Sequence, residues 1–330
     1  MTEIIAEVGS VHDGSFGNAK NIIQLAKECG ADTVKFQHHI PDHETLVSAP
    51  SPAYFKGENR YEYFQRTSFT IDQWVELIQF SREINIGFLI SPFSIESVNI
   101  LSEIGCNEFK VASGEVTNIP LLERISQVSH KVVLSSGMSN WEELDNAVSM
   151  LIDKCSITVM QCTSKYPCPL ELAGLNIIQE ISNRYGSKVN VGFSDHTESL
   201  CTGAAAKMMG ANTIEKHLTF SKKMYGSDAP FAMEPEDLKL YISLIRDCEL
   251  MLNSKVDKDD LKHFSDMKSV FQKSIVASEF ISEGTRLSTR HLAYKKPGDG
   301  IPASAYQDLI GLRVTKNLLK DEKFEWSILK

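Results

Sequence analysis

The residues of this sequence that could do chemistry stand within or directly after short apolar segments. Lys35 and Lys110 lie inside such segments, where a lysine must place its charge against a partner or a ligand. His196 and His217 end two others. Further polar residues end or follow most of the remaining segments, namely Glu7, Gln37, Ser91, Ser113, Glu115, Ser135, Ser164, Tyr166 and Glu215. If the segments are the parallel strands of a barrel, all these side chains meet at one mouth.

Two lysines and several hydroxyls at one barrel mouth would suit an anionic ligand. Lys35 and Gln37 are two positions apart and therefore share one face of a strand. Phosphate is the natural anion, because ammonium groups, hydroxyls and loop N–H groups complement its oxygens. For any single serine a turn or cap residue is the commoner interpretation, so the prediction of a phosphate site depends on the whole set.

The two histidines are candidate metal ligands. His196 and His217 end consecutive segments, and imidazoles on neighbouring strands could share a divalent cation with positions left for substrate and water. Nitrogen ligands suit Mn²⁺, Fe²⁺, Co²⁺ or Zn²⁺ better than Ca²⁺. A purely structural role for each histidine stays open at this point.

The composition is that of an acidic globular protein. Of 330 residues, 42% are hydrophobic and 23% charged, which argues against a disordered, collagen-like or coiled-coil chain. Asp and Glu outnumber Lys and Arg by 43 to 34, so the net charge is −9 and we expect no nucleic-acid partner. No apolar run reaches about 18 residues, and no basic region precedes the first apolar run. We therefore expect no membrane partner and a cytoplasmic location.

The cysteines fit that location. All seven lack a Cys-x-x-Cys partner, so they are interpreted as reduced thiols and not as a disulfide framework or a zinc site. Cys162 and Cys168 are interpreted as packing thiols.

Short apolar segments alternate with amphipathic helical patterns over most of the chain. The expected strands are Ile4–Val8, Thr33–Gln37, Gly87–Pro92, Glu108–Ser113, Lys131–Ser136, Ile157–Cys162, Val189–Ser194 and Thr213–Thr219. The expected helices are Ala19–Cys29, Ile71–Asn85, Ile95–Ile104, Pro120–Val128, Trp141–Lys154, Leu175–Tyr185, Leu200–Met209 and Pro235–Asn253, with Thr70 and Ser139 as capping signals. Eight strand–helix units indicate an α/β protein with a (β/α)₈ TIM barrel. A doubly wound open sheet is the rival, but no Gly-x-Gly-x-x-Gly follows the first strand.

One connection stands out by its length. Between the second strand and the next helix lie roughly 30 residues, His38–Phe69, and loops beyond about 12–15 residues are uncommon and often functional. In a barrel this loop would lie on the active face. The loop contains three histidines, His38, His39 and His43, and exposure of their side chains to solvent is one interpretation that the sequence allows.

The sequence divides into a barrel over residues 1–254, a charged linker over 255–273 and a small module over 274–330. In the module the period changes to the short β-like runs Ser274–Ser278, Leu292–Lys296 and Leu309–Val314, separated by glycine and proline turns. A module of about 60 residues buries little core of its own, so we expect it to dock on another surface.

The chain resembles the sialic acid synthases, the bacterial N-acetylneuraminate synthase group that also makes legionaminic and related nonulosonic acids. The matching segments include Ile5-Ala-Glu-Val-Gly, Ala31-Asp-Thr-Val-Lys-Phe-Gln, Ser91-Pro-Phe-Ser, Phe109-Lys-Val-Ala-Ser-Gly-Glu, Gln161-Cys-Thr-Ser-Lys-Tyr-Pro, Gly192-Phe-Ser-Asp-His-Thr, Glu215-Lys-His-Leu-Thr and Gly226-Ser-Asp. The tail from Ser274, with Lys295-Lys-Pro-Gly-Asp-Gly-Ile, resembles the antifreeze-like SAF domain of these enzymes, a β-clip fold.

The resemblance implies a transferase that condenses phosphoenolpyruvate with an N-acylated amino-hexose such as N-acetylmannosamine. The products would be a nine-carbon sugar acid and phosphate. It also implies a domain-swapped homodimer in which each small domain covers the partner's barrel mouth. The divalent metal would typically be Mn²⁺, with Mg²⁺ or Co²⁺ as alternatives, held by His196 and His217.

The resemblance also assigns roles by position. The residues implied for phosphoenolpyruvate are Lys35, Ser91, Lys110, Ser113, Ser135 and Ser164. Those implied for the sugar are Gln37, Glu115, Tyr166, Asp228 and Lys296 of the small domain. Glu7 and Glu115 would be the catalytic carboxylates that handle protons.

Some positions depart from the family pattern, and the exact sugar stays open. Val11-His12-Asp13-Gly14 stands where the family often has Asn-His-x-Gly, and Lys296 stands where an arginine is usual. A lysine brings a point charge where arginine brings a planar fork. Alternative substrates are a 6-phosphorylated hexose or a di-N-acetylated dideoxy hexose, with a 9-phosphate or legionaminic-type product. An alternative from another class is a non-catalytic carbohydrate-binding protein.

Overall fold

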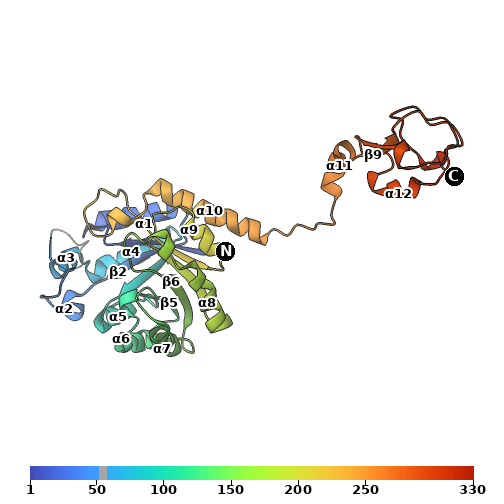
Figure 1. The fold of residues 1–330 in the computed structure, drawn as a ribbon. Coiled ribbons are helices and arrows are strands. Elements are labelled where there is room, and N and C mark those ends of the chain that lie inside the picture. The colour runs from blue at the N-terminus through green and yellow to red at the C-terminus, as the bar shows by residue number, and fades with distance from the viewer. Residues whose placement is uncertain (52–57) are drawn as a thin grey trace. The chain divides into compact units, whose positions relative to one another are not determined.

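The structure is a computed structural model that describes residues 1–51 and 58–330. It divides into two compact units, Met1–Ser254 and Lys255–Lys330, and each is described by itself. Figure 1 shows both units with their helices and strands labelled. Among the described residues, none of the helices combines the length and the apolar character needed to cross a membrane.

The first unit is a closed barrel of eight strands in which every strand runs parallel to both neighbours and the first pairs with the last. The strands are β1 (Glu3–Gly9), β2 (Thr33–His38), β3 (Gly87–Pro92), β4 (Glu108–Val111), β5 (Lys131–Ser135), β6 (Ser156–Cys162), β7 (Asn190–Asp195) and β8 (Thr213–His217). This confirms the eight-stranded parallel barrel expected from the sequence, and it excludes the open doubly wound sheet.

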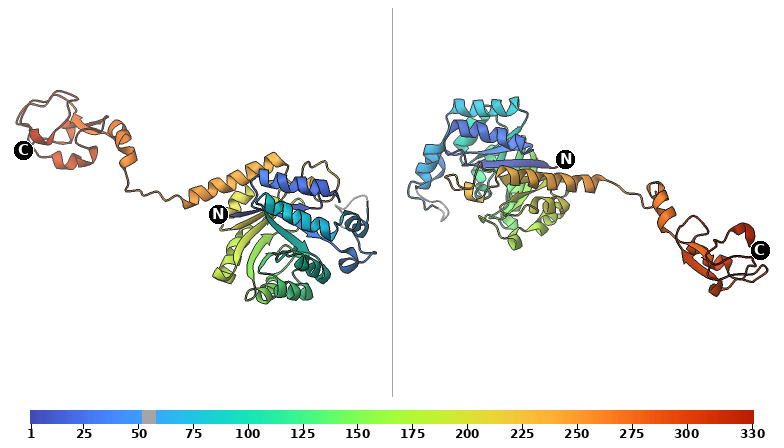
Figure 2. Two further views of the ribbon diagram at one scale, coloured as in Figure 1. Left: turned by 180° about the vertical axis from the view of Figure 1, so that it is seen from behind. Right: turned by 90° about the horizontal axis from the view of Figure 1, so that it is seen from above.

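Helices surround the barrel, as the two views of Figure 2 show. The helices that follow or precede the strands are α1 (Phe16–Glu28), α4 (Ile71–Glu83), α5 (Ile95–Glu103), α6 (Ile119–Val128), α7 (Trp141–Leu151), α8 (Leu175–Tyr185), α9 (Thr202–Met208) and α10 (Pro235–Asn253). Short 3₁₀ turns lie at Ser113–Glu115, Leu170–Leu172, Gly186–Lys188 and Ala229–Phe231. On α6 the buried residues Leu121, Leu122 and Ile125 recur at helical spacing, so one apolar face packs inward.

The helix caps bear out one capping signal and correct the other. Thr70 caps α4 and forms a reciprocal capping box with Gln73. For α7 the expected cap, Ser139, is wrong by one residue. Asn140 caps this helix instead, because its side chain reaches the backbone N–H of Glu143 and the Glu143 side chain returns the bond.

The long connection after β2 is not structureless. Its described part contains two helices, α2 (Pro41–Glu44) and α3 (Arg60–Thr67), while residues 52–57 lie outside the description. His38 is buried, and the His39 side chain is 8% exposed. Solvent exposure was one interpretation for His38, His39 and His43. Among these three, only His43 has an exposed side chain.

Alternation along the strands places a polar layer directly above an apolar one inside the barrel. Ile5, Leu89, Val133 and Met160 form a small buried cluster, separate from the larger core between the strands and the helices. Side chains two positions apart share one face of a strand. The residues two positions further toward the carboxyl ends of these strands are Glu7, Ser91, Ser135 and Cys162. The polar layer therefore faces the same mouth as the strand ends.

The second unit has its own small core, formed by Ile275, Ala277, Ile281, Leu287, Leu292, Ile301, Leu309, Val314, Leu318, Phe324 and Ile328. Its regular elements are α11 (Ser265–Phe271), β9 (Ser274–Ala277), β10 (Leu292–Lys295) and α12 (Tyr306–Leu309), with 3₁₀ turns at Lys262–Phe264, Thr289–His291, Ala303–Ala305 and Trp326–Ile328. β9 and β10 pair antiparallel. The expected strand over Leu309–Val314 is wrong, since Leu309 ends α12 and Val314 makes only an isolated bridge with Leu329.

Candidate active site

A cavity of about 490 Å³ lies at the carboxyl ends of the barrel strands. Of the residues expected at the site, the cavity is lined by Glu7, Lys35, Gln37, Lys110, Ser113, Glu115, Ser135, Ser164, Tyr166, His196, His217 and Asp228. Ser91 is not among the lining residues. It lies buried near the end of β3, and its hydroxyl has no hydrogen-bond partner among the described residues. Lys296 belongs to the second unit, where its ammonium lies 4.9 Å from the ring centre of Phe271.

The two lysines form a buried ionic cluster with two carboxylates. Lys110 Nζ donates to both oxygens of Glu215 at 2.9 Å. Lys35 Nζ lies 3.4 Å from Glu215 and 3.1 Å from Glu7. Burial lowers the pKa of Lys110, with Glu215 opposing, whereas for Lys35 the nearby Glu215 and Glu7 outweigh burial and raise the pKa. Burial alone would raise the pKa of Glu215, but Lys110 and Lys35 outweigh it and hold that carboxyl ionised.

Serine hydroxyls converge beside this cluster around Gly137. The Ser113 hydroxyl accepts a hydrogen bond from the backbone N–H of Gly137 at 3.2 Å. A side chain at position 137 would collide with the hydroxyls of Ser164 and Ser113. Glycine is therefore what allows two hydroxyls and a backbone N–H to face one small volume, as a phosphate site requires.

Two carboxylates at the mouth have environments that favour holding a proton. Burial raises the pKa of Glu7, with Lys35 opposing. Burial also raises the pKa of Glu115, against a 2.7 Å hydrogen bond from Asn118. Gln37 donates to Glu7 at 2.6 Å, which fixes one of its oxygens. Raised carboxyl pKa values are the condition under which Asp and Glu act as acids and bases near neutral pH.

The two histidines lie side by side at the mouth, with ring centres 5.5 Å apart. His196 donates through Nδ1 to the carbonyl of Thr163 at 2.9 Å, which leaves a lone pair on Nε2, where Tyr166 Oη lies at 3.0 Å. Burial lowers the pKa of His217 to about 3, so this ring is neutral. Within the described ranges, no group of three or more His, Cys, Asp and Glu residues is arranged to hold a metal. The chain thus offers two imidazole nitrogens, which fits a cation that takes its other ligands from substrate and water.

Cys162 was interpreted as a packing thiol, and the structure corrects this. It lines the cavity, with its sulfur 3.8 Å from His196 Nδ1. Burial raises the pKa of Cys162, but the neighbouring imidazole outweighs it and lowers the value to about 7. The thiolate in turn outweighs burial and raises the pKa of His196.

Asp228 reaches the site from a distant part of the sequence. Its carboxylate accepts from the backbone N–H of Ser10 at 2.8 Å and from the Ser10 hydroxyl at 2.7 Å. Gly9, with a φ of +54°, makes this approach possible, since a Cβ there would meet the Asp228 carboxylate. The loop after β8 is thereby fastened to the end of β1.

Sequence reasoning expected Glu215 at this mouth, because it shares a strand face with His217, but assigned it no role. It missed several other residues of the cavity wall. Ser10, Arg60, Phe64 and Phe93 line the cavity from segments outside the barrel strands, where the alternation used to place the other residues does not apply.

Comparison with known proteins now identifies the family, since residues 22–257 match the model of the NeuB family. The chain belongs to the NeuB family. It is 34% identical to the N,N'-diacetyllegionaminic acid synthase of Campylobacter jejuni, over 97% of this chain and 98% of that protein. It is 31% identical to the human N-acetylneuraminate-9-phosphate synthase, over 97% of this chain and 90% of that protein.

A solved structure agrees with the NeuB assignment. The N-acetylneuraminic acid (sialic acid) synthetase of Leptospira borgpetersenii, in complex with citrate, superimposes with a TM-score of 0.70 at 27% identity. The match covers 81% of this chain and 91% of that one. The resemblance noted from sequence motifs is thus confirmed at the level of the family, which includes relatives named for different sugar acids.

Proposed function

We propose that this NeuB-family protein is a nonulosonic acid synthase that condenses phosphoenolpyruvate with an N-acylated amino-hexose. One observation carries the proposal. Two buried lysines, a group of convergent serine hydroxyls and two cavity-facing imidazoles share one barrel mouth. A carbohydrate-binding protein would have no need for a buried ionic cluster at this place. The names of the two synthase relatives support the same reaction class.

In this proposal the lysine cluster and the serines hold phosphoenolpyruvate. Lys35 and Lys110 would exchange part of their contact with Glu215 for the ligand's anionic oxygens, and Ser113, Ser135 and Ser164 would donate to them. Ser91, whose buried hydroxyl has no partner among the described residues, joins this group. An acidic chain can bind such an anion because these cations are concentrated in one cleft.

The chemistry joins the C3 carbon of phosphoenolpyruvate to the aldehyde carbon of the open-chain sugar. Water then adds at C2, and the bond between C2 and the phosphate-bridging oxygen breaks. One hydrogen of the water ends on the former aldehyde oxygen and one on the phosphate, so the products balance. Glu7 and Glu115 are proposed to handle these protons. Gln37, Tyr166 and Asp228 line the cavity where the sugar would lie.

His196 and His217 are proposed to hold a divalent cation, most naturally Mn²⁺, with Mg²⁺ or Co²⁺ as alternatives. When bound, the cation would supply Lewis acidity toward the aldehyde oxygen. The chain's own part is to keep both rings oriented and accessible. The Thr163 carbonyl fixes the tautomer of His196, and burial keeps His217 neutral.

The small unit is proposed to act as an antifreeze-like domain in a domain-swapped homodimer, with Lys296 reaching the sugar end of the partner's site. Mixing tests this. One inactive chain would carry Lys110→Met and the other would end before Ser274. Partial activity in mixed dimers supports a shared site, and no recovery in proven mixed dimers contradicts it.

The function itself is tested by phosphate release from phosphoenolpyruvate with a panel of amino-hexoses. The panel holds N-acetylmannosamine, its 6-phosphate and a 2,4-di-N-acetylated dideoxy hexose, each with and without Mn²⁺. Metal-dependent release with one sugar, together with a product of the expected mass, supports the proposal. Release with none of them, by a chain that is folded and metal-loaded, contradicts it.

A further inference from the structure

A chain of hydrogen bonds runs from the connection after β2 into the candidate active site. Glu44, at the end of α2, lies 2.7 Å from Nδ1 of His39. Nε2 of His39 lies 3.0 Å from the side-chain oxygen of Gln37. The amide nitrogen of Gln37 donates to Glu7 at 2.6 Å. This series of hydrogen bonds begins at Glu44, on the connection after β2. It ends at Glu7, one of the two proposed catalytic carboxylates.

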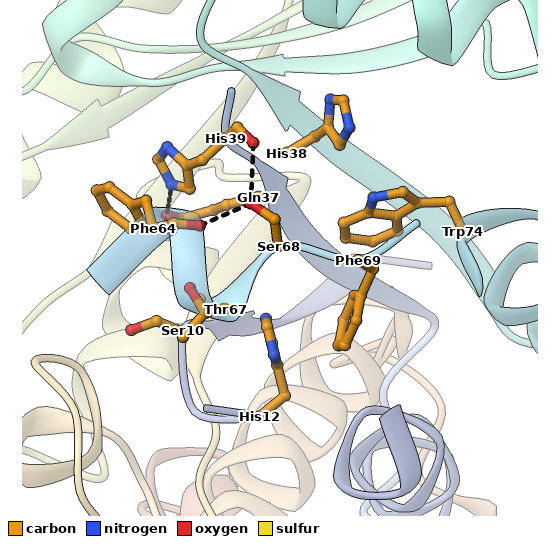
Figure 3. Close-up of a pocket in the computed structure, with 11 residues that line it drawn as sticks. Ser10, His12, Gln37, His38, His39, Phe64, Thr67, Ser68, Phe69 and Trp74 are labelled. Carbon is orange, nitrogen blue, oxygen red and sulfur yellow. Dashed lines mark hydrogen bonds between the residues drawn. The ribbon is translucent and has the colours of Figure 1, made fainter. Parts of the chain in front are cut away.

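His39 is held firmly in this position. Its ring stacks between Phe64 and Phe93, with ring centres 3.6 and 4.2 Å away and planes within 16° of parallel. The side chains of His39 and Glu44 are 8% and 4% exposed. Figure 3 shows His39 with Phe64 and Gln37 beside it. A ring that is packed on both faces and bonded through both nitrogens has one orientation.

For the ionised form of Glu7, counting hydrogens gives the direction of each of these bonds. When Glu7 is ionised, its carboxylate only accepts, so Gln37 must turn its NH₂ group toward Glu7 and its oxygen toward His39. Nε2 of His39 must then carry a hydrogen. One further hydrogen lies between Nδ1 and the Glu44 carboxyl group, because that contact also needs a donor.

We propose that His39 is a positioning residue for the reaction, acting through Gln37 on Glu7. Its Nε2–H holds the amide of Gln37 in the orientation that presents NH₂ to the Glu7 carboxylate. Without that hydrogen the amide can rotate and place its oxygen against Glu7, where two acceptors repel. The described part of the connection after β2, through Glu44 and Phe64, thereby sets the geometry of a residue at the barrel mouth. The catalytic part of this inference depends on the proposed function.

The main variant is His39→Phe, which keeps an aromatic ring in the stack and removes both nitrogens. We expect kcat to fall about tenfold, in line with the loss of a hydrogen bond to a charged group, while KM for phosphoenolpyruvate changes less than about twofold. The matched control is His43→Phe on α2, where the side chain is exposed and lies 3.4 Å from Glu96. The control should keep full activity, and both variants should keep the far-ultraviolet circular dichroism spectrum of the parent chain.

A double-mutant cycle separates positioning from a general packing role. In a Gln37→Leu background, His39→Phe should cost less than about twofold in kcat, because the residue through which it acts is gone. Equal losses in both backgrounds would overturn the proposal, since they would mean that His39 only stabilises the fold. A rise in KM for phosphoenolpyruvate with unchanged kcat would overturn it as well.

A readout that needs no substrate keeps this test independent of the proposed function. Nitrogen-15 NMR of the full chain, with His39 assigned by comparison with His39→Phe, reports which ring nitrogens carry hydrogen. The expected spectrum has a hydrogen on Nε2. A lone pair on Nε2 would overturn the hydrogen-bond assignment even in an active enzyme. A protonated Nε2 in a chain that is inactive with every sugar would leave the bond assignment standing and reject the proposed function.

Discussion

Two lysines of the barrel strands, Lys216 on β8 and Lys110 on β4, are both almost fully buried but have different surroundings. Lys216, on β8, has a side chain 1% exposed and lies 3.3 Å from Asp195. It also donates to the backbone carbonyl of Thr197. The Asp195 carboxylate accepts further hydrogen bonds from Tyr241 at 2.9 Å and from Thr202 at 2.5 Å. Protein groups thus surround this ion pair, and we call these residues the closed cluster.

Lys110 has a side chain 2% exposed, yet it faces the cavity. Its partner Glu215 is shared with Lys35, and the nearby Glu7 has one oxygen that accepts no hydrogen bond from the described residues, although it lies 3.1 Å from Lys35. We call these four residues the open cluster. The difference teaches that burial of a lysine does not indicate function. The closed cluster can only stabilise the fold, whereas the open cluster can rearrange its contacts around an incoming anion.

The largest effect should come from breaking the closed cluster. Asp195→Ala removes the carboxylate that the buried Lys216 ammonium and the hydroxyls of Tyr241 and Thr202 share. Loss of one partner of a buried ion pair costs about 3–5 kcal/mol, so we expect the free energy of unfolding to fall by that amount. Urea denaturation measures it. A loss below about 1 kcal/mol would show that this cluster is not closed to solvent.

Imidazoles extend the same comparison, since His12 and His38 are enclosed while His196 and His217 face the cavity. Burial lowers the pKa of both enclosed rings from 6.5 to about 4. As the pH falls, these two histidines are therefore protonated in the unfolded chain before they are protonated in the folded chain. The free energy of unfolding decreases between about pH 6.5 and 4. The loss is about 3 kcal/mol for each ring at pH 4.

His38→Gln tests this directly, because it removes one titrating group and keeps a side chain that can bond to Ser97. Urea midpoints between pH 7 and 4.5 should then depend less steeply on pH than in the parent chain. An unchanged slope would mean that His38 is accessible to protons in the folded state. The absolute stability at pH 7 serves as the reference for each variant.

The barrel and the lysines of the open cluster could both be predicted from the sequence, because both depend on the pattern of residues within single strands. Lysines inside apolar strands are rare, and period-two alternation places Lys35 on the same strand face as Gln37. The same reasoning did not set Lys216 apart as structural, because its partner Asp195 is recognised only when β7 and β8 are paired.

What remained hidden depends on contacts between segments far apart in the chain. The bond between Ser10 and Asp228 joins positions 218 residues apart, and no local pattern encodes it. The stacking of His39 between Phe64 and Phe93 likewise joins the connection after β2 to the connection after β3. In the small unit, turns and isolated bridges replaced the expected strand over Leu309–Val314, since a chain with so few paired residues gives weak periodicity.

A change in the open cluster should affect binding more than stability. Lys110→Met removes one ammonium, and Lys35 remains beside Glu215, so we expect little change in the urea midpoint. If phosphoenolpyruvate is the ligand, its KM should rise about tenfold or more, since a lost hydrogen bond to a charged group costs about 1.5–3 kcal/mol. Steady-state phosphate release measures both constants. An effect confined to the KM of the sugar would reassign this lysine.

The smallest expected effect concerns the Tyr166 hydroxyl, which contacts the cavity-facing ring of His196. Tyr166 Oη lies 3.0 Å from Nε2 of His196, the same lone pair that a cation would use. Tyr166→Phe removes this competitor and keeps the ring, which packs 4.2 Å from the centre of the His196 ring. A neutral hydrogen bond is worth about 0.5–1.5 kcal/mol, so the Kd for Mn²⁺ should fall by about two- to tenfold in calorimetric titrations. His217→Ala, which leaves a single imidazole, is the control that should abolish this binding. Weaker binding in Tyr166→Phe would mean that the hydroxyl helps to hold the cation, and Tyr166 would then join His196 and His217 as a ligand.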